Sequence, residues 1–94
     1  MAQVETTDNE AEHRYEARVG GEVGGVAVYE RRAGVIDFQH TEVDDSLEGQ
    51  GVGSALARAA LDDVRRDGTL RVVASCPFIA EWIERHPDYR DLLA

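Results

Sequence analysis

The first half of the chain alternates between apolar and polar positions in a way that predicts strands. Residues 13–19 alternate over a short run, and residues 22–32 and 35–43 are longer runs rich in β-branched and aromatic side chains. Gly20-Gly21 and Ala33-Gly34 separate these runs and are typical of tight turns. Three strands joined by tight turns predict an antiparallel meander.

A glycine pair interrupts the second of these predicted strands. Gly24-Gly25 lies inside residues 22–32 and weakens the pattern of a regular strand there. We therefore expect a β-bulge, or a close approach of another backbone segment, at this pair.

The second half of the chain has the spacing of a helix followed by another strand. After the meander, apolar side chains lie on one stripe of a helix: Val52, Leu56, Ala59, Ala60 and Val64. Arg65 and Arg66 complement the dipole of its last turn, and Gly68 stands at the position of a C-cap. Residues 70–74 read as a fourth strand, which a right-handed crossover would place parallel to residues 35–43.

A second, amphipathic helix is predicted over residues 78–86. Pro77 fits its first turn, Pro87 ends it, and residues 88–93 can form a last short turn. We interpret its apolar face as core, with a binding role as the alternative; the face consists of Phe78, Ile79, Trp82 and Ile83. The predicted fold class is α+β, a small mixed sheet (an antiparallel meander plus one parallel crossover strand) with two main helices.

The N-terminal residues have a different character. Residues 1–12 are polar and acidic without periodicity, so we expect a flexible tail, with residues 13–94 as a single domain. Residues 1–13 also lack the basic-then-apolar order of a signal peptide, and no apolar run approaches the roughly 18 residues of a membrane span. We expect a soluble, cytoplasmic protein without a membrane partner, either a monomer or a weak dimer.

The charge of the chain restricts its partners. Ten basic and 19 acidic residues give a net charge of −9, which argues against non-specific nucleic-acid binding. Every basic residue is arginine, and a lysine-free acidic surface suits a protein that lives in high salt. We state a halophilic source as a hypothesis, which full stability in low salt would contradict. The alternative is the arginine-rich translation of a GC-rich genome.

A glycine-rich loop precedes the first predicted helix. Gly51-Val52-Gly53 opens this helix, and residues 48–54 offer a row of backbone N–H groups that suits a pyrophosphate. The alternative is a tight turn without a ligand. A Walker A loop needs a lysine, and a dinucleotide-binding loop needs a larger parallel sheet, so both interpretations fit less well.

Several blocks of the sequence resemble one family. The third strand followed by Glu48-Gly49-Gln50-Gly51-Val52-Gly53-Ser54 resembles the acetyl-CoA motif of the GNAT superfamily of N-acetyltransferases, commonly written Gln/Arg-x-x-Gly-x-Gly/Ala. Gly51 and Gly53 match that motif, whereas Glu48 departs from it. The likeness is closer to a short, single-domain YjdJ/NATD1-like branch. It rests on the glycine loop and on Phe38-x-His40-Thr41-Glu42-Val43, Cys76-Pro77-Phe78 and Arg85-His86-Pro87-x-Tyr89, and it extends from Tyr15 to the C-terminus.

This resemblance implies an acetyl-CoA-dependent N-acetyltransferase acting on an amine of a protein or small molecule by direct attack in a ternary complex. The backbone of Thr41, Glu42 and Val43 would pair with the pantetheine arm. The segment Cys76, Pro77 and Phe78 would lie beside the thioester. The pyrophosphate would be held by Gln50, Gly51, Val52, Gly53 and Ser54.

Cys76 and His40 are the candidate catalytic residues. A thiol at a helix N-terminus is more reactive than usual, so Cys76 can accept the acetyl group, act as a general acid, or line the pocket. The alternative is a buried structural cysteine. Histidine is a common general base, with a plain sheet histidine as the alternative. Strand alternation predicts that Glu42, but not Asp37, shares a face with His40.

Other potential sites receive simpler interpretations. We expect His86 to cap the end of the second helix, with a place near the cofactor as the alternative. Cys76 is the only cysteine, which excludes an intramolecular disulfide, and no set of ligands has metal-binding spacing, so we expect no metal. Two other functions remain open: a non-catalytic acyl-CoA-binding module, and a structural or partner-binding domain whose glycine loop is only a turn.

Overall fold

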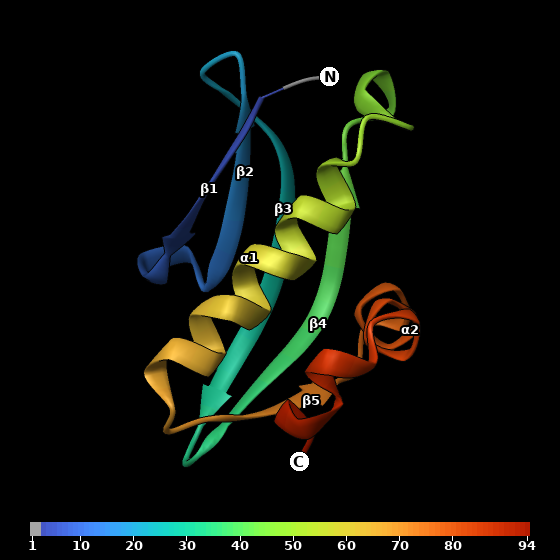
Figure 1. The fold of residues 1–94 in the computed structure, drawn as a ribbon. Helices are drawn as coiled ribbons and strands as arrows, with labels where there is room; N and C mark the ends of the chain where they lie inside the picture. Colours follow the sequence, from blue (N-terminus) through green and yellow to red (C-terminus); the bar gives the residue numbers. More distant parts are fainter. Residues whose placement is uncertain (1–2) are drawn as a thin grey trace.

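The computed structural model describes residues 3–94 as one five-stranded sheet with its two main helices on the same face (Figure 1). The strands are β1 (Val4–Asn9), β2 (Arg14–Val19), β3 (Glu22–Arg32), β4 (Val35–Val43) and β5 (Arg71–Ala74). The helices are α1 (Val52–Asp67) and α2 (Pro77–Arg85), and short 3-10 helices cover Glu10–Glu12, Asp45–Leu47 and Pro87–Leu92.

The order of the strands in the sheet follows their order in the sequence, β1-β2-β3-β4-β5. The first four strands are antiparallel, and β5 pairs with β4 in parallel after the crossover through α1. The predicted α+β class and the parallel crossover strand are therefore confirmed. At the end of α1, Gly68 has the left-handed conformation expected of a C-cap, with φ of 75°, and its N–H donates to Val64 O.

The expectation of a flexible N-terminal tail is wrong for residues 4–12. β1 pairs with β2 along its whole length, from Val4 opposite Val19 to Asn9 opposite Arg14. Polar side chains hold it in place: Tyr29 Oη donates to Asp8 Oδ1 at 2.5 Å. Of the β1 residues, Val4 alone packs against the hydrophobic core. The segment therefore lacks the apolar periodicity that would predict a strand. Residues 1 and 2 lie outside the described part of the chain.

The core lies between the sheet and the two helices. Its largest fully buried side chains come from β4, α1, β5 and α2: Phe38, Ile36, Leu56, Leu61, Ile79, Ile83, Val52 and Val72. Trp82 is also buried, as predicted. Phe78 is the exception to the prediction that this face of α2 is core, because it is 40% exposed at the start of α2 and its ring lies against Gly53 of α1.

Two bulges interrupt the ladders of the sheet. Ala17 pairs with Gly25 and Arg18 with Val23, so Gly24 is an extra residue in β3. A Cβ atom on Gly24 would collide with the side chain of Leu47. The bulge expected at the glycine pair is thus present, and the close approach at Gly24 comes from a side chain and not from another stretch of backbone.

The second bulge, at Gln39 of β4, overturns the prediction about faces. Val28 pairs with His40 and Tyr29 with Phe38, so Gln39 is the extra residue. Asp37 pairs with Glu30, which lies two residues from Val28 on β3 and so on the same face. Asp37 and His40 therefore share a face, because the bulge resets the alternation that the sequence had implied.

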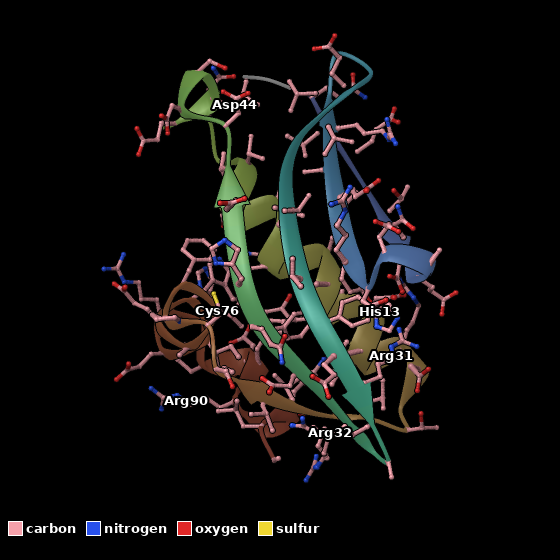
Figure 2. The ribbon with its side chains drawn as sticks, turned by 180° about the vertical axis from the view of Figure 1, so that it is seen from behind. His13, Arg31, Arg32, Asp44, Cys76 and Arg90 are labelled. Atoms are coloured by element: carbon pink, nitrogen blue, oxygen red, sulfur yellow. The ribbon has the colours of Figure 1, made fainter. Side chains whose placement is uncertain are left out.

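The sheet face opposite the helices is seen in Figure 2, with β3 and β4 in the foreground and α1 behind them. On this face, Glu16 of β2 is 4% exposed. It accepts hydrogen bonds from Asn9 Nδ2 at 3.1 Å and from Arg14 Nε at 2.8 Å, and Arg18 lies beside it. The bonds from Asn9 and then Arg14 lower the pKa of the Glu16 carboxyl.

We expect Glu16→Gln to lower the free energy of unfolding at pH 7 by about 1–2 kcal/mol, because charge-assisted hydrogen bonds are lost. A carboxyl with a lowered pKa stabilises the fold above its ordinary value of 4.5 and loses this effect as the pH falls through its folded value. The difference in the free energy of unfolding between the two proteins should therefore shrink as the pH falls from 4.5 through the lowered pKa of the folded state. Urea unfolding of both proteins across this range measures it, and a constant difference would contradict the role of the charge.

Candidate functional site

β4 and β5 separate after Phe38, which opens a gap at one edge of β4. Their pairing runs from Val35 opposite Arg71 to Phe38 opposite Ala74. Cys76 N–H then donates to Phe38 O at 2.8 Å, and the chain turns away into α2. Within residues 3–94, the rest of β4 pairs with β3 alone, so its other edge is free from residue 39 to residue 43.

The free edge of β4 presents backbone groups of Thr41 and Val43. Asp44 N–H donates to Gly24 O at 2.8 Å, so the backbone of Asp44 points toward β3. In an antiparallel strand these groups alternate in direction, which turns Glu42 toward β3 and turns Thr41 and Val43 to the open side. An extended ligand can pair with such an edge as a further strand does.

The glycine loop lies between the end of β4 and α1 and leaves the start of the helix uncapped. Gly51 is the N-cap residue in the left-handed conformation, with φ of 78°, and makes no side-chain cap hydrogen bond. The first turn carries no acidic residue. The N–H groups of Val52, Gly53 and Ser54 have no partner in the helix itself and are available to an anion.

A hollow of about 720 Å³ adjoins this loop. Its lining comes from the loop, from the exposed side of α1 and from β1: Val4, Gly49, Gln50, Gly51, Ser54, Ala55 and Arg58. Gln50, Gly51 and Ser54 are predicted pyrophosphate residues, and the structure brings them together. The hollow combines backbone donors, a hydroxyl and a guanidinium, which are groups that bind phosphate.

Arg58 is a residue of this hollow that the sequence analysis missed. It follows Ser54 by four residues and so lies on the same side of α1. Its guanidinium lies 5.3 Å from the centroid of the Trp82 ring, and Nη1 donates to Tyr89 Oη at 3.4 Å. The spacing of four from Ser54 is the signal that could have identified it. Val4 was missed because β1 was not predicted.

Cys76 lies on the helix side of the sheet, next to the opening of β4. It is 3% exposed, and its Sγ lies 3.4 Å from Thr41 Oγ1. Figure 2 shows the Cys76 sulfur between β4 and α2. Phe78, two residues on, rests against Gly53, so the start of α2 meets the start of α1. The structure thus brings Thr41, Cys76 and the glycine loop to one end of the helix layer.

His40 projects from the opposite face of the sheet. Its Nε2 lies 3.3 Å from Glu42 Oε1, and both side chains are exposed. Cys76 contacts Thr41, whose partner Ala27 is buried on the helix side, whereas His40 is opposite Val28 on the other face. The two predicted catalytic residues, His40 and Cys76, are therefore not in contact, although both lie next to Thr41 at the gap where β4 and β5 separate.

Asp37 shares the face of His40 but is buried. Its Oδ2 accepts a hydrogen bond from Arg32 Nη2 at 3.4 Å, and its Oδ1 has no hydrogen-bond partner among the described residues. Farther along β4, a second hollow of about 640 Å³ opens beside the strand end, and three of its lining residues are the acidic Glu42, Asp44 and Asp45. This acidic rim suits a cationic molecule approaching the open edge.

His86 has the expected place at the end of α2. Its Nδ1 lies 2.7 Å from Trp82 O, and its ring stacks on the Trp82 ring with centroids 3.8 Å apart. Over residues 3–94, no three His, Cys, Asp or Glu side chains gather as metal ligands do. The described helices are all too short or too polar to cross a membrane.

Residues 14–92 match the sequence profile of the GCN5-related N-acetyl-transferase family. The chain belongs to this family. Among curated relatives, it is 40% identical to Protein NATD1 of Bos taurus and 38% identical to that of Homo sapiens, in each case over 53 residues. The alignments cover 56% of this chain and 46% of either relative, so this GNAT chain spans about half the length of the curated relatives it matches. The resemblance to the NATD1-like branch is confirmed.

Two solved structures share the fold. A GCN5-like protein of Staphylococcus aureus, studied by NMR in solution, superposes with a TM-score of 0.74 at 27% identity over 100% of this chain and 91% of its own. IAA acetyltransferase from Bacillus cereus superposes with a TM-score of 0.63 at 18% identity, covering 92% of this chain and 75% of its own. The second likeness concerns the fold alone.

Proposed function

We propose that this chain is an acetyl-CoA-dependent N-acetyltransferase that transfers an acetyl group to an amine in a ternary complex. The observation that carries the proposal is the continuity between two binding surfaces. The free edge of β4 at Thr41 and Val43 leads through the loop to the uncapped start of α1. A cofactor with two amides in its arm and a pyrophosphate at its end fits that sequence of groups.

The residues divide into those that bind the cofactor and those that assist the reaction. The N–H groups of the loop and Arg58 would hold the phosphates, and the edge of β4 would hold the pantetheine amides. Bound acetyl-CoA supplies the activated acetyl group. Backbone N–H groups at the open edge can donate to a carbonyl oxygen on which negative charge develops.

His40 and Cys76 would act from the two sides of the opening. His40, supported by Glu42 at 3.3 Å, is exposed on the face with the acidic rim and can take a proton from an incoming ammonium group. Cys76 lies beside Thr41 on the other side and can donate a proton to the departing thiolate. The acidic rim formed by Glu42, Asp44 and Asp45 favours a cationic amine as the acceptor.

A second candidate function is a module that holds acyl-CoA without turnover. It is favoured by the separation of the two catalytic candidates on opposite faces of β4 and by the burial of Cys76 at 3% exposure. It shares the cofactor site with the first proposal and differs only in the absence of a chemical step.

Titration calorimetry with acetyl-CoA, in low and in high salt, tests the cofactor site first. We expect binding in at least one condition, and a folded protein that binds in neither would refute both functions. Release of CoA thiol is then measured against a panel of cationic amines. Release supports the transferase, whereas tight binding with no release across the panel supports the non-catalytic module.

We expect His40→Gln to lower turnover by about a hundredfold or more, the usual loss on removing a general base, with little change in the Kd for acetyl-CoA. Cys76→Ala should also lower turnover while the Kd is kept. Gln39→Ala is a matched control, because Gln39 adjoins His40 but bonds to Glu30. Unchanged turnover in Cys76→Ala would remove the thiol from the mechanism, and unchanged turnover in His40→Gln would remove the imidazole.

A further inference from the structure

The hollow of about 720 Å³ beside the glycine loop is called the phosphate hollow below. Trp82 of α2 does not line this hollow but contacts a residue that does. The indole is 5% exposed, and its Nε1–H donates to Ser54 Oγ at 2.9 Å. Ser54 lies on α1 and does line the hollow. This hydrogen bond therefore connects the core of the protein to one wall of the candidate phosphate site.

The bond determines what the Ser54 hydroxyl can do. An indole N–H is a donor only, so the hydroxyl oxygen accepts, and the hydroxyl proton remains free. Within residues 3–94, Ser54 Oγ has no other hydrogen-bond partner. A hydroxyl held in this way keeps its proton for an acceptor in the hollow, such as a phosphate oxygen.

The same indole supports the other polar side chain that α1 contributes to the hollow. The Arg58 guanidinium lies over the Trp82 ring at 5.3 Å from its centroid. Arg58 also donates to Tyr89 Oη, which in turn donates to Asp62 Oδ1 at 2.7 Å. A single buried side chain thus contacts both Ser54 and Arg58, four residues apart on α1.

We propose that Trp82 is a positioning residue for the phosphate hollow, which fixes the Ser54 hydroxyl as a donor toward the ligand and steadies Arg58 beside it. The proposal rests on the proposed function, because it takes the hollow to be the site of the CoA pyrophosphate. In this proposal Trp82 contacts no ligand and acts through its indole N–H, not only through the size of its side chain.

The substitution Trp82→Phe tests the contribution of the indole N–H separately from that of the aromatic ring. Phenylalanine keeps an aromatic ring in the core and can stack on His86, but it cannot donate to Ser54. We expect the Kd for CoA to rise about three- to tenfold in Trp82→Phe and by a similar factor in Ser54→Ala, the range that one hydrogen bond contributes. The double variant should bind about as weakly as Ser54→Ala alone, because both changes remove the same hydrogen bond while phenylalanine keeps an aromatic ring for Arg58.

Two comparisons distinguish positioning from a general loss of structure. S-acetylpantetheine lacks the pyrophosphate, so its Kd should be the same for wild type and Trp82→Phe. Ser54→Thr keeps the hydroxyl and should bind CoA more tightly than Ser54→Ala. Thermal unfolding of each variant shows that it is folded under the conditions of the titration.

The outcomes are distinguishable from those for the proposed function. If the wild type binds no CoA, the proposed function fails and this inference fails with it. If the wild type binds CoA and folded Trp82→Phe binds it equally well, the inference alone is overturned. The inference is also overturned if Trp82→Phe raises the Kd for CoA and for S-acetylpantetheine by the same factor. The same holds if the factors by which the two single substitutions raise the Kd for CoA multiply in the double variant. If Trp82→Phe does not fold, the test rests on Ser54→Ala, because Ser54 is exposed and its substitution leaves the core intact. A Kd for CoA equal to that of the wild type in Ser54→Ala then overturns the inference.

Discussion

Replacing Arg58 with alanine is expected to raise the Kd for CoA by about tenfold to a hundredfold, the loss typical of a hydrogen bond to a charged group. Arg58 is the basic residue among those that line the hollow. The chain as a whole carries a net charge of −9, so the phosphates gain no general attraction from the surface. One local cation must therefore offset much of this repulsion.

The matched control is Arg66→Ala on the same helix. Arg66 pairs with Asp63 at 2.9 Å and lies outside the hollow, yet its removal changes the net charge equally. Arg58→Lys should recover part of the affinity, because the charge returns without the planar fork. Calorimetric titrations at two salt concentrations measure these effects, and a loss in Arg66→Ala as large as that in Arg58→Ala would show that only net charge matters.

The regular elements of the fold could be predicted because their signals are local. Glycine turns bound the strands at residues 22–32 and 35–43, and the structure gives both strands these limits. Residues 52–67 carry an apolar stripe and are followed by the C-cap glycine Gly68, and α1 ends at Asp67 as this signal predicts. In each case the chain segment itself contains the information that determines the element.

Features that depend on distant partners could not be predicted. β1 is held by its ladder with β2 and by side-chain contacts such as Tyr29 to Asp8, 21 residues apart, so no periodicity within residues 1–12 reveals it. The bulge at Gln39 is a property of the pairing between two strands and leaves no pattern in one of them. Missing this bulge led to the wrong assignment of faces for Asp37 and His40.

The candidate site was predictable in its backbone and less so in its side chains. Glycines with positive φ and an uncapped helix start follow from the residue types of the loop, and Gly49 and Gly51 have φ of 80° and 78°. Arg58 and Trp82 join the site through contacts between α1 and α2, which required the packing of the two helices. The free edge of β4 likewise depends on where β5 ends.

The two phenylalanines of the chain offer the largest expected contrast between stability and binding. Phe38→Ala should lower the free energy of unfolding by about 3–5 kcal/mol, because its side chain is fully buried and its loss leaves a cavity. Phe38 packs near Tyr15 and Tyr29, and it lies where β4 and β5 begin to separate. A domain of this size has a total stability of about 5–14 kcal/mol, so the variant should be close to unfolding at moderate temperature.

Phe78→Ala is the matched change, and we expect it to weaken acetyl-CoA binding with little effect on stability. Phe78 is 40% exposed, so we expect a loss of stability below about 1 kcal/mol. Its ring, however, lies against Gly53 at the start of α1, and its removal should weaken acetyl-CoA binding there. Urea unfolding and calorimetric titration of both variants separate the two effects. A Phe78→Ala protein as unstable as Phe38→Ala would place this ring in the core after all, and unchanged acetyl-CoA affinity in a stable Phe78→Ala protein would exclude it from the cofactor site.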